Sequence, residues 1–384
     1  MKFEFMTANR IIFERGSINQ IGKIAKTFGH KVLLASGNME AVTERVAGYL
    51  KDEGLQVTVV SVQGEPSIEG IKESLEVARK ANCDMTIGFG GGSAMDTGKI
   101  IAAMLSNPGE IIEYLEVIGA GRSLSNPSVP CIAVPTTSGT GAEVTKNSVI
   151  SSHEHKVKVS LRSSYMLPEV VIMDPELTLS VPPPVTASTG LDALTQVLEP
   201  FVSSAANPIT DAFCREGLKR ASSSLKKAFD DGSDIDAREE MALASLFGGL
   251  ALANAKLGAV HGFAGVIGGM FPIPHGVVCA DLLPFSIEVN VKALSEREPN
   301  SDYLKRFDEV AEILTGKRDA KAKDAVIWIQ ELCQHLKVPS LSTFGITEKD
   351  FPEIIEKSMV ASSMKGNPIK LTYEELEEIL KKAM

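Results

Sequence analysis

The chain has 384 residues, which is longer than one hydrophobic core usually serves, so its length predicts two domains. Its apolar fraction of 44% and charged fraction of 23% are ordinary for a globular protein, and no apolar span is long enough for a membrane helix. The net charge of −10 argues against nucleic acid or an anionic membrane surface as a partner.

The N-terminus shows no signal-peptide pattern, because charged residues interrupt its apolar ones. The five cysteines are scattered along the chain without a C-x-x-C pair, which favours reduced thiols. We therefore expect a cytoplasmic protein.

Short runs rich in β-branched residues alternate with amphipathic segments through the first half of the chain. This alternation predicts a mostly parallel sheet with helices on both faces and ligands at the carboxyl ends of its strands. We expect strands at 31–36, 56–62, 85–89 and 129–134, helices at 42–50, 71–80 and 93–105, and a hairpin at 145–160. We assign no chemistry to the two hairpin histidines, His153 and His155.

A glycine-rich stretch follows the strand expected at 85–89. Its sequence, GFGGGSAMDTGK over 88–99, places four glycines where the strand would turn into a helix. Ser93 is a candidate N-cap, and Asp96 completes a Ser-x-x-Asp capping pattern. Backbone N–H groups at such a turn favour a phosphate, although a tight turn without a ligand would have the same composition. The motif is neither G-x-G-x-x-G nor a Walker A loop, so it does not specify a nucleotide.

A second loop, PTTSGTGAEVT over 135–145, follows the strand expected at 129–134. Its hydroxyls and amides would suit a phosphate or a ribose, and a plain surface loop is the alternative. The first expected strand ends at residues 35–38, Ala-Ser-Gly-Asn, with no acid before Glu40. Because a carboxylate at that place commonly binds the ribose of NAD, its absence favours NADP.

The three prolines at 182–184 mark the expected boundary between a domain over 1–181 and an all-helical domain over 182–384. Helices are expected there at 191–202, 212–228, 238–254, 259–269, 301–314, 322–336 and 373–382.

The helical half carries a metal-binding pattern. Asp192 and Gln196 are four residues apart, hence on one helix face, and His261 and His275 lie beside glycine or proline in apolar surroundings. One carboxylate and two imidazoles suit iron or zinc and leave a position open for substrate.

With these motifs in order, the chain resembles the iron-containing (group III) alcohol dehydrogenases of the dehydroquinate synthase-like superfamily over nearly its whole length. The resemblance implies a Rossmann-like N-terminal domain and a helical-bundle C-terminal domain that together bind NAD(P) and a metal. It also implies a homodimer and a small alcohol or aldehyde as substrate. It places the nucleotide at Gly37, Gly91, Gly92, Ser93, Thr136, Thr137, Thr145 and Lys158, and the metal at Asp192, Gln196, His261 and His275.

Two positions depart from the family pattern. Family members tend to carry histidine where this chain has Gln196 and Gly265. An amide is a weaker ligand than imidazole, but related enzymes bind zinc through one acid and two histidines, so Asp192, His261 and His275 could form a catalytic site.

The resulting hypothesis is hydride transfer between NADP(H) and an alcohol or aldehyde carbon, with the metal polarising the substrate oxygen. Two alternatives remain open at this point. One is a metal-free reductase similar to the maleylacetate reductases, and the other is a nucleotide-binding relative that has lost catalysis.

Overall fold

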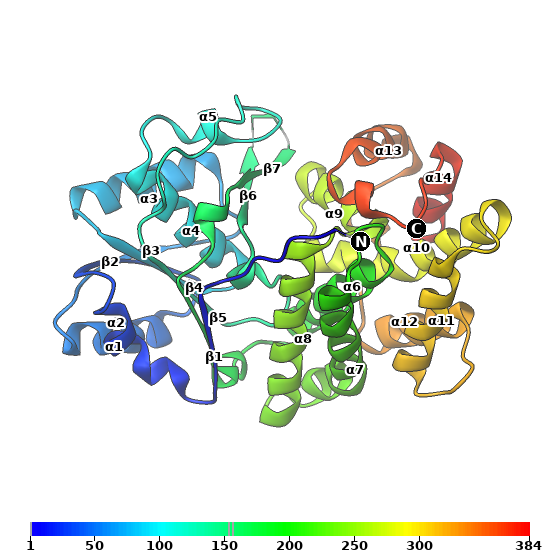
Figure 1. Ribbon diagram of the computed structural model, residues 1–384, viewed down its shortest axis with the longest axis horizontal. Helices are drawn as coiled ribbons and strands as arrows, with labels where there is room; N and C mark the ends of the chain where they lie inside the picture. Colours follow the sequence, from blue (N-terminus) through cyan, green and yellow to red (C-terminus); the bar gives the residue numbers. More distant parts are fainter. Residues whose placement is uncertain (1, 153, 156) are drawn as a thin grey trace. The chain divides into compact units, whose positions relative to one another are not determined.

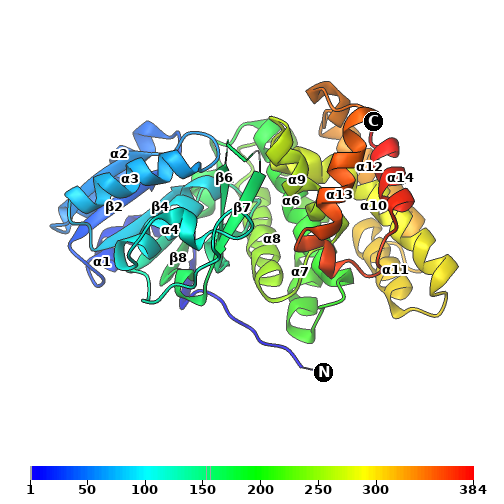
Figure 2. The ribbon, with the colours of Figure 1, turned by 90° about the horizontal axis from the view of Figure 1, so that it is seen from above.

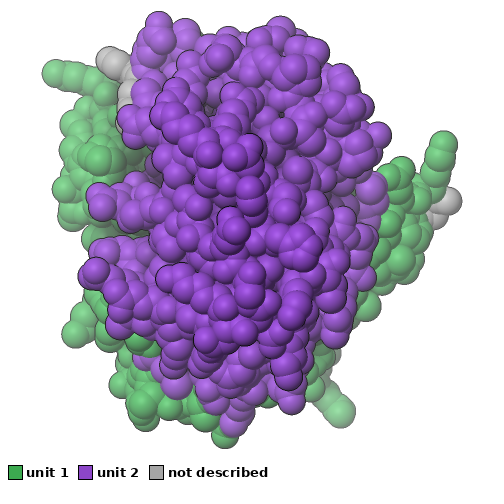
Figure 3. All heavy atoms as spheres, turned by 90° about the vertical axis from the view of Figure 1, so that its left-hand side faces the viewer, with its two compact units in different colours: residues 1–5, 138–140, 180–384 green, residues 6–137, 141–179 purple. Residues whose placement is uncertain are grey.

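The structure is a computed structural model that describes residues 2–152, 154–155 and 157–384. The chain folds into two compact units (Figure 3). The α/β unit comprises residues 6–137 and 141–179, and the helical unit comprises residues 180–384 with residues 138–140 and the N-terminal residues through Phe5. The predicted hairpin residue His153 lies outside the described residues.

The α/β unit is built on a six-stranded parallel sheet of order β1-β8-β5-β4-β2-β3 (Figure 1). The predicted parallel sheet is therefore confirmed, but the edge strand β1 was not predicted, because four residues are too few to show a pattern. The strands are β1 Arg10–Phe13, β2 Lys31–Ser36, β3 Gln56–Ser61, β4 Met85–Gly90, β5 Cys131–Pro135 and β8 Val170–Met173.

Helices cover both faces of this sheet. Alternate residues of β2 enter two different cores, with Val32 and Leu34 in one and Leu33 and Ala35 in the other. The first core is covered by α1 and α2 and the second by α3, α4 and α5 (Figure 1). The helices are α1 Ile21–Ala25, α2 Glu40–Asp52, α3 Ile68–Lys80, α4 Gly92–Ser106 and α5 Ile111–Tyr114. The predicted hairpin is present as β6 Asn147–Ser152 and β7 Val157–Arg162.

The junction of β4 and α4 depends on its glycines. Gly90 has φ of 148°, a conformation that other residues rarely adopt. A Cβ at Gly98 would lie 3.0 Å from the backbone of Gly88, so these two glycines let the helix lie directly on the strand. Gly98 thus has the helix-packing role that the last glycine serves in G-x-G-x-x-G motifs, although its spacing differs.

The capping prediction at this junction was wrong. The N-cap residue is Gly91, and Ser93 already lies inside α4. Asp96 accepts a hydrogen bond from the Val149 N–H at 3.0 Å and pairs with Lys99 at 3.2 Å. The glycines allow the helix to begin before the serine, so the carboxylate is free to bind the hairpin instead.

The helical unit contains nine α-helices among the residues described. Helix α6 begins at Pro183 rather than after the proline run, because proline is tolerated in the first turn. Helices α10 and α13 were not predicted. The helices are α6 Pro183–Val202, α7 Pro208–Asp230, α8 Ile235–Asn254, α9 Ala259–Met270, α10 His275–Arg297, α11 Asp302–Thr315, α12 Ala322–His335, α13 Phe351–Val360 and α14 Tyr373–Lys382.

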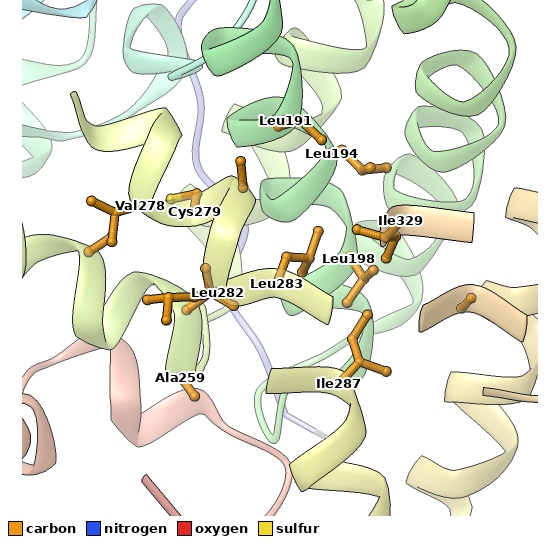
Figure 4. Packing of buried hydrophobic residues seen from close by; sticks show 14 of the residues in the cluster. Leu191, Leu194, Leu198, Ala259, Val278, Cys279, Leu282, Leu283, Ile287 and Ile329 are labelled. Atoms are coloured by element: carbon orange, nitrogen blue, oxygen red, sulfur yellow. The ribbon is translucent and has the colours of Figure 1, made fainter. Parts of the chain in front are cut away.

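Helix α6 is the buried centre of this unit and packs among α7, α8 and α10 (Figures 1 and 2). Every residue from 190 to 202 is buried. Leucines 191, 194 and 198 of α6 belong to the same cluster as Val278, Leu282, Leu283 and Ile287 of α10 (Figure 4). Any polar side chain on this helix must therefore find its partners inside the protein.

No single helix in the described part of the chain has the length and apolar composition needed to cross a membrane. Helices α8 and α9 reach that composition only when taken together, and they are bent by 95° at their junction.

Candidate active site

Three polar side chains lie on one stripe of α6. Asp192, Gln196 and Glu199 follow the i, i+4, i+7 spacing of a single helix face, and all three are buried. Burying carboxylates is costly unless other groups compensate their charge. Two histidines from neighbouring helices provide that compensation.

His261 is in the first turn of α9, and His275 is the first residue of α10. The Nε2 atom of His261 lies 3.3 Å from Asp192 Oδ1, and that of His275 lies 4.0 Å from the same oxygen. A Cβ at Gly276 would lie 2.1 Å from the Ser188 carbonyl oxygen. The glycine after His275 therefore lets α10 begin directly against α6, one turn before Asp192.

Glu199 orients His261. Its carboxylate accepts hydrogen bonds from the Val260 N–H at 2.7 Å and the His261 N–H at 3.4 Å, so it caps the N-terminus of α9. It also lies 2.7 Å from Nδ1 of His261. With Nδ1–H donating to this carboxylate, Nε2 faces Asp192 and is the ring nitrogen that can bind a metal after it loses its proton. Sequence reasoning missed Glu199, although its i+7 spacing from Asp192 is visible in the sequence.

Charge in the cluster is balanced between Asp192 and its neighbours. Burial acts to raise the pKa of Asp192, but His261 and His275 outweigh it, so the pKa of this carboxyl lies below its ordinary value. Burial acts to lower the pKa of His261, but Cys279, Asp192 and Glu199 outweigh it and raise that pKa well above its ordinary value. The site thus holds Asp192 as a carboxylate.

Cys279 is a fourth side chain of the cluster, and it was not predicted. It lies one turn after His275 on α10, is fully buried, and has its Sγ 3.9 Å from Nε2 of His261. Burial raises the pKa of this thiol to about 12. One ligand atom from each of Asp192, His261, His275 and Cys279 lies within 4.8 Å of the others.

These residues fit a divalent metal. Asp192 Oδ1 is buried and has no hydrogen-bond partner among the described residues, although two imidazole nitrogens are near it. Oxygen and imidazole nitrogen donors are those that iron and zinc accept. Gln196 is buried on the same stripe and donates from Nε2 to the Gly139 carbonyl oxygen at 3.2 Å, while its Oε1 atom has no hydrogen-bond partner in the described part of the chain.

The α/β unit brings the predicted nucleotide residues together at three adjacent strands. Gly37 follows β2 and donates its N–H to Phe89 of β4 at 2.9 Å, and Thr136 follows β5 and donates its N–H to Gly90 at 2.8 Å. A Cβ on Gly91 would lie 3.4 Å from Thr137 Oγ1. Between β2 and β4 the strand order reverses, which is the place where open α/β sheets bind ligands. Gly92 and Ser93 begin α4 there, with first-turn N–H groups that have no acceptor inside the helix.

Two other predicted nucleotide residues lie in local networks of the same unit. Thr145 Oγ1 lies 3.1 Å from the fully buried Lys99 Nζ, which also donates to the Ala142 carbonyl oxygen. Lys158, on β7, pairs with Glu65 at 2.6 Å. Lys99 thus holds the end of the threonine loop in place.

Models of a known family match nearly the whole chain. The model for iron-containing alcohol dehydrogenase matches residues 8–175, and that for the Fe-containing alcohol dehydrogenase family, C-terminal, matches residues 186–384. The chain belongs to the iron-containing alcohol dehydrogenase family. It is an oxidoreductase acting as an alcohol dehydrogenase, and membership implies a nucleotide cofactor and a metal. The predicted family, fold class and activity are confirmed.

Individual relatives of this dehydrogenase align from end to end. It is 34% identical over 394 residues to 1,3-propanediol dehydrogenase of Citrobacter freundii, covering 99% of this chain and 98% of that protein. It is 32% identical to NAD-dependent methanol dehydrogenase of Bacillus methanolicus, covering 97% of each. A crystal structure of 1,3-propanediol oxidoreductase superposes with a TM-score of 0.92 at 33% identity and covers 100% of both chains.

Proposed function

We propose that Asp192, His261 and His275 bind a catalytic iron or zinc ion and that the protein reversibly oxidises small alcohols to aldehydes or ketones with NADP. One observation supports this above the others. A buried carboxylate oxygen without a hydrogen-bond partner in the described residues lies 3.3 Å and 4.0 Å from two imidazole nitrogens. One carboxylate oxygen with two imidazole nitrogens beside it in a buried place is the usual form of a ligand set.

The metal would supply Lewis acidity toward the substrate oxygen. Asp192 contributes a negative charge in a buried place, and Glu199 fixes the ring of His261 so that Nε2 can donate its lone pair. Gly265 lies one turn after His261 and has no side chain to accept a proton. We propose that the alcohol proton leaves through water or the nicotinamide ribose hydroxyls.

In the α/β unit we propose that the first N–H groups of α4, at Gly91, Gly92 and Ser93, bind the pyrophosphate. Thr136, Thr137, Thr145 and Lys158 complete the proposed site. Gly37 carries no charge where an acid would repel a 2′-phosphate, which favours NADP over NAD.

Three further predictions belong to this proposal. Residues 1–181 and 182–384 act as the nucleotide and metal domains, two chains form a homodimer, and the enzyme works in the cytoplasm. Light scattering of the purified protein tests the second prediction, and fractionation of the source cells tests the third.

The first experiment measures metal content by elemental analysis, together with NADPH-dependent reduction of short aldehydes before and after chelation. We expect about one iron or zinc ion per chain. Asp192→Ala should lose the metal and turnover but retain NADPH binding. Asp211→Ala, which removes a carboxylate that pairs with Arg306 in the same unit, serves as the control and should keep both.

Unchanged turnover in Asp192→Ala would contradict the metal mechanism and support a metal-free reductase.

A further inference from the structure

We propose that the thiolate of Cys279 is the fourth protein ligand of the metal. The proposal rests on the metal site proposed above and extends it to a residue outside the predicted ligand set. It would give a donor set of one carboxylate oxygen, two imidazole nitrogens and one sulfur, with the sulfur supplied by α10.

The positions of the four donor atoms support this assignment. Tetrahedral zinc with bonds of about 2.0–2.3 Å has neighbouring ligands about 3.3–3.8 Å apart. Asp192 Oδ1 and His261 Nε2 are 3.3 Å apart, Cys279 Sγ and His261 Nε2 are 3.9 Å apart, and His275 Nε2 and Asp192 Oδ1 are 4.0 Å apart. All four donor atoms lie within 4.8 Å of one another, so shifts of up to about 1 Å would complete the coordination.

The place of Cys279 in the helix supports the assignment independently. Residues four apart share a helix face, so a site that His275 can reach is within reach of Cys279. Neighbouring residues Val278, Leu282 and Leu283 fix this turn of α10 in the core of the helical unit (Figure 4). The sulfur is thus held beside the imidazole of His261 by backbone that cannot easily move away.

Gln196 is the other candidate for the fourth position, and it is the weaker one. Its Nε2 atom is already bound to the Gly139 carbonyl oxygen. Its amide oxygen is neutral, whereas a thiolate is a charged and softer donor that zinc binds strongly. As the metal binds, the Cys279 thiol loses its proton to solvent, so one proton is released for each sulfur–metal bond formed.

Four protein ligands are compatible with catalysis. Catalytic zinc sites can accommodate five ligands, so four protein ligands would still leave room for a substrate oxygen. The thiolate would also offset the positive charge of the ion in a buried place, where an uncompensated charge is costly.

The test replaces the native metal with Co²⁺ in the full-length protein and records its near-ultraviolet spectrum. A thiolate ligand gives a sulfur-to-cobalt charge-transfer band that oxygen and nitrogen ligands do not. We expect the band in the wild-type protein, its loss in Cys279→Ser, and its retention in Cys214→Ser, which removes another fully buried thiol of the helical unit. We also expect Cys279→Ser to bind Co²⁺ at least roughly tenfold more weakly.

The outcomes separate the two proposals. One Co²⁺ per chain without the band, or a band that survives Cys279→Ser, would overturn the role of Cys279 and leave the proposed function intact. Failure to bind any metal would overturn both. X-ray absorption of the wild-type zinc protein needs no variant, and the absence of a sulfur neighbour at about 2.3 Å would also contradict the proposal.

Discussion

The replacement Glu199→Gln separates ligand orientation from helix capping. In the wild-type protein the Glu199 carboxylate accepts from the Val260 N–H and the His261 N–H, and it lies 2.7 Å from His261 Nδ1. Glutamine keeps one acceptor oxygen but loses the charge, and its amide group can donate a hydrogen bond to an imidazole nitrogen. Part of the His261 population would then carry its proton on Nε2, and a protonated Nε2 cannot bind a metal.

The expected effects differ in size for metal affinity and stability. Loss of a carboxylate behind a metal-binding histidine typically weakens metal binding about 10- to 100-fold. Glu199→Ala would in addition leave two buried N–H groups of α9 without an acceptor, at about 1–3 kcal/mol each, so the free energy of unfolding should fall by about 2–6 kcal/mol. Glu199→Gln should lose clearly less stability, because one oxygen can still cap the helix.

The assay is competition for Zn²⁺ against a chromophoric chelator, paired with urea unfolding of the metal-free protein. Asn207→Ala is the matched control, since Asn207 caps α7 of the same unit through the Ile209 and Thr210 N–H groups. That variant should lose about 1 kcal/mol of stability and keep its metal affinity. Wild-type zinc affinity in Glu199→Gln would show that Glu199 only caps the helix, and the reasoning would be refuted.

Three further predictions follow from single positions. Gly37→Asp places a Cβ 3.6 Å from the nearest atom, so the variant should fold normally. Because the introduced carboxylate would repel the 2′-phosphate, the preference for NADP over NAD in kcat/KM should fall by roughly 10- to 100-fold. An unchanged ratio of the two kcat/KM values would contradict the placement of the 2′-phosphate. Gly265→His would meet no described atom within 4 Å at its Cβ, so the pH profile of alcohol oxidation should gain a step near the imidazole pKa of about 6.5, and a profile without it would show that this position does not reach the reacting alcohol. Burial raises the pKa of Glu143 from 4.5 to about 7, so this side chain favours the folded state below pH 4.5 and loses that contribution as the pH rises through 7. The effect of Glu143→Gln on the free energy of unfolding should therefore be more favourable at pH 8 than at pH 4, by up to about 3 kcal/mol. An equal effect of the substitution at the two pH values would contradict this.

The loops after β4 and β5 could be predicted because their signals are local. Glycines between an apolar strand and a helix determine a turn wherever they occur, and β4, α4 and β5 lie close to the predicted ranges. The start of α4 was misplaced for a physical reason. A glycine can serve as an N-cap through its backbone alone, and a search for a capping side chain selects the serine two residues later.

The fourth side chain of the metal cluster could not be predicted without α10. This helix contains Pro284 and is buried along most of its length, so its sequence shows neither an unbroken helical run nor a polar face. His275 falls between the helices predicted at 259–269 and 301–314, so its i, i+4 relation to Cys279 carried no information. Recognition of the helix start at Pro274 would have identified Cys279 as a residue on the same face.

Glu199 links the stability of the helical unit to the chemistry of its site. The same carboxylate caps α9 and orients the histidine that α9 carries, so the helix and the ligand position form together. A bound metal stabilises the folded state in proportion to the logarithm of its concentration over its dissociation constant. Thermal stability of the helical unit should therefore rise with added metal, and this rise should be smaller in any variant that disorients His261. Under the proposed metal site, the buried polar stripe of α6 should lower the free energy of unfolding of the metal-free protein and raise it when the metal is bound.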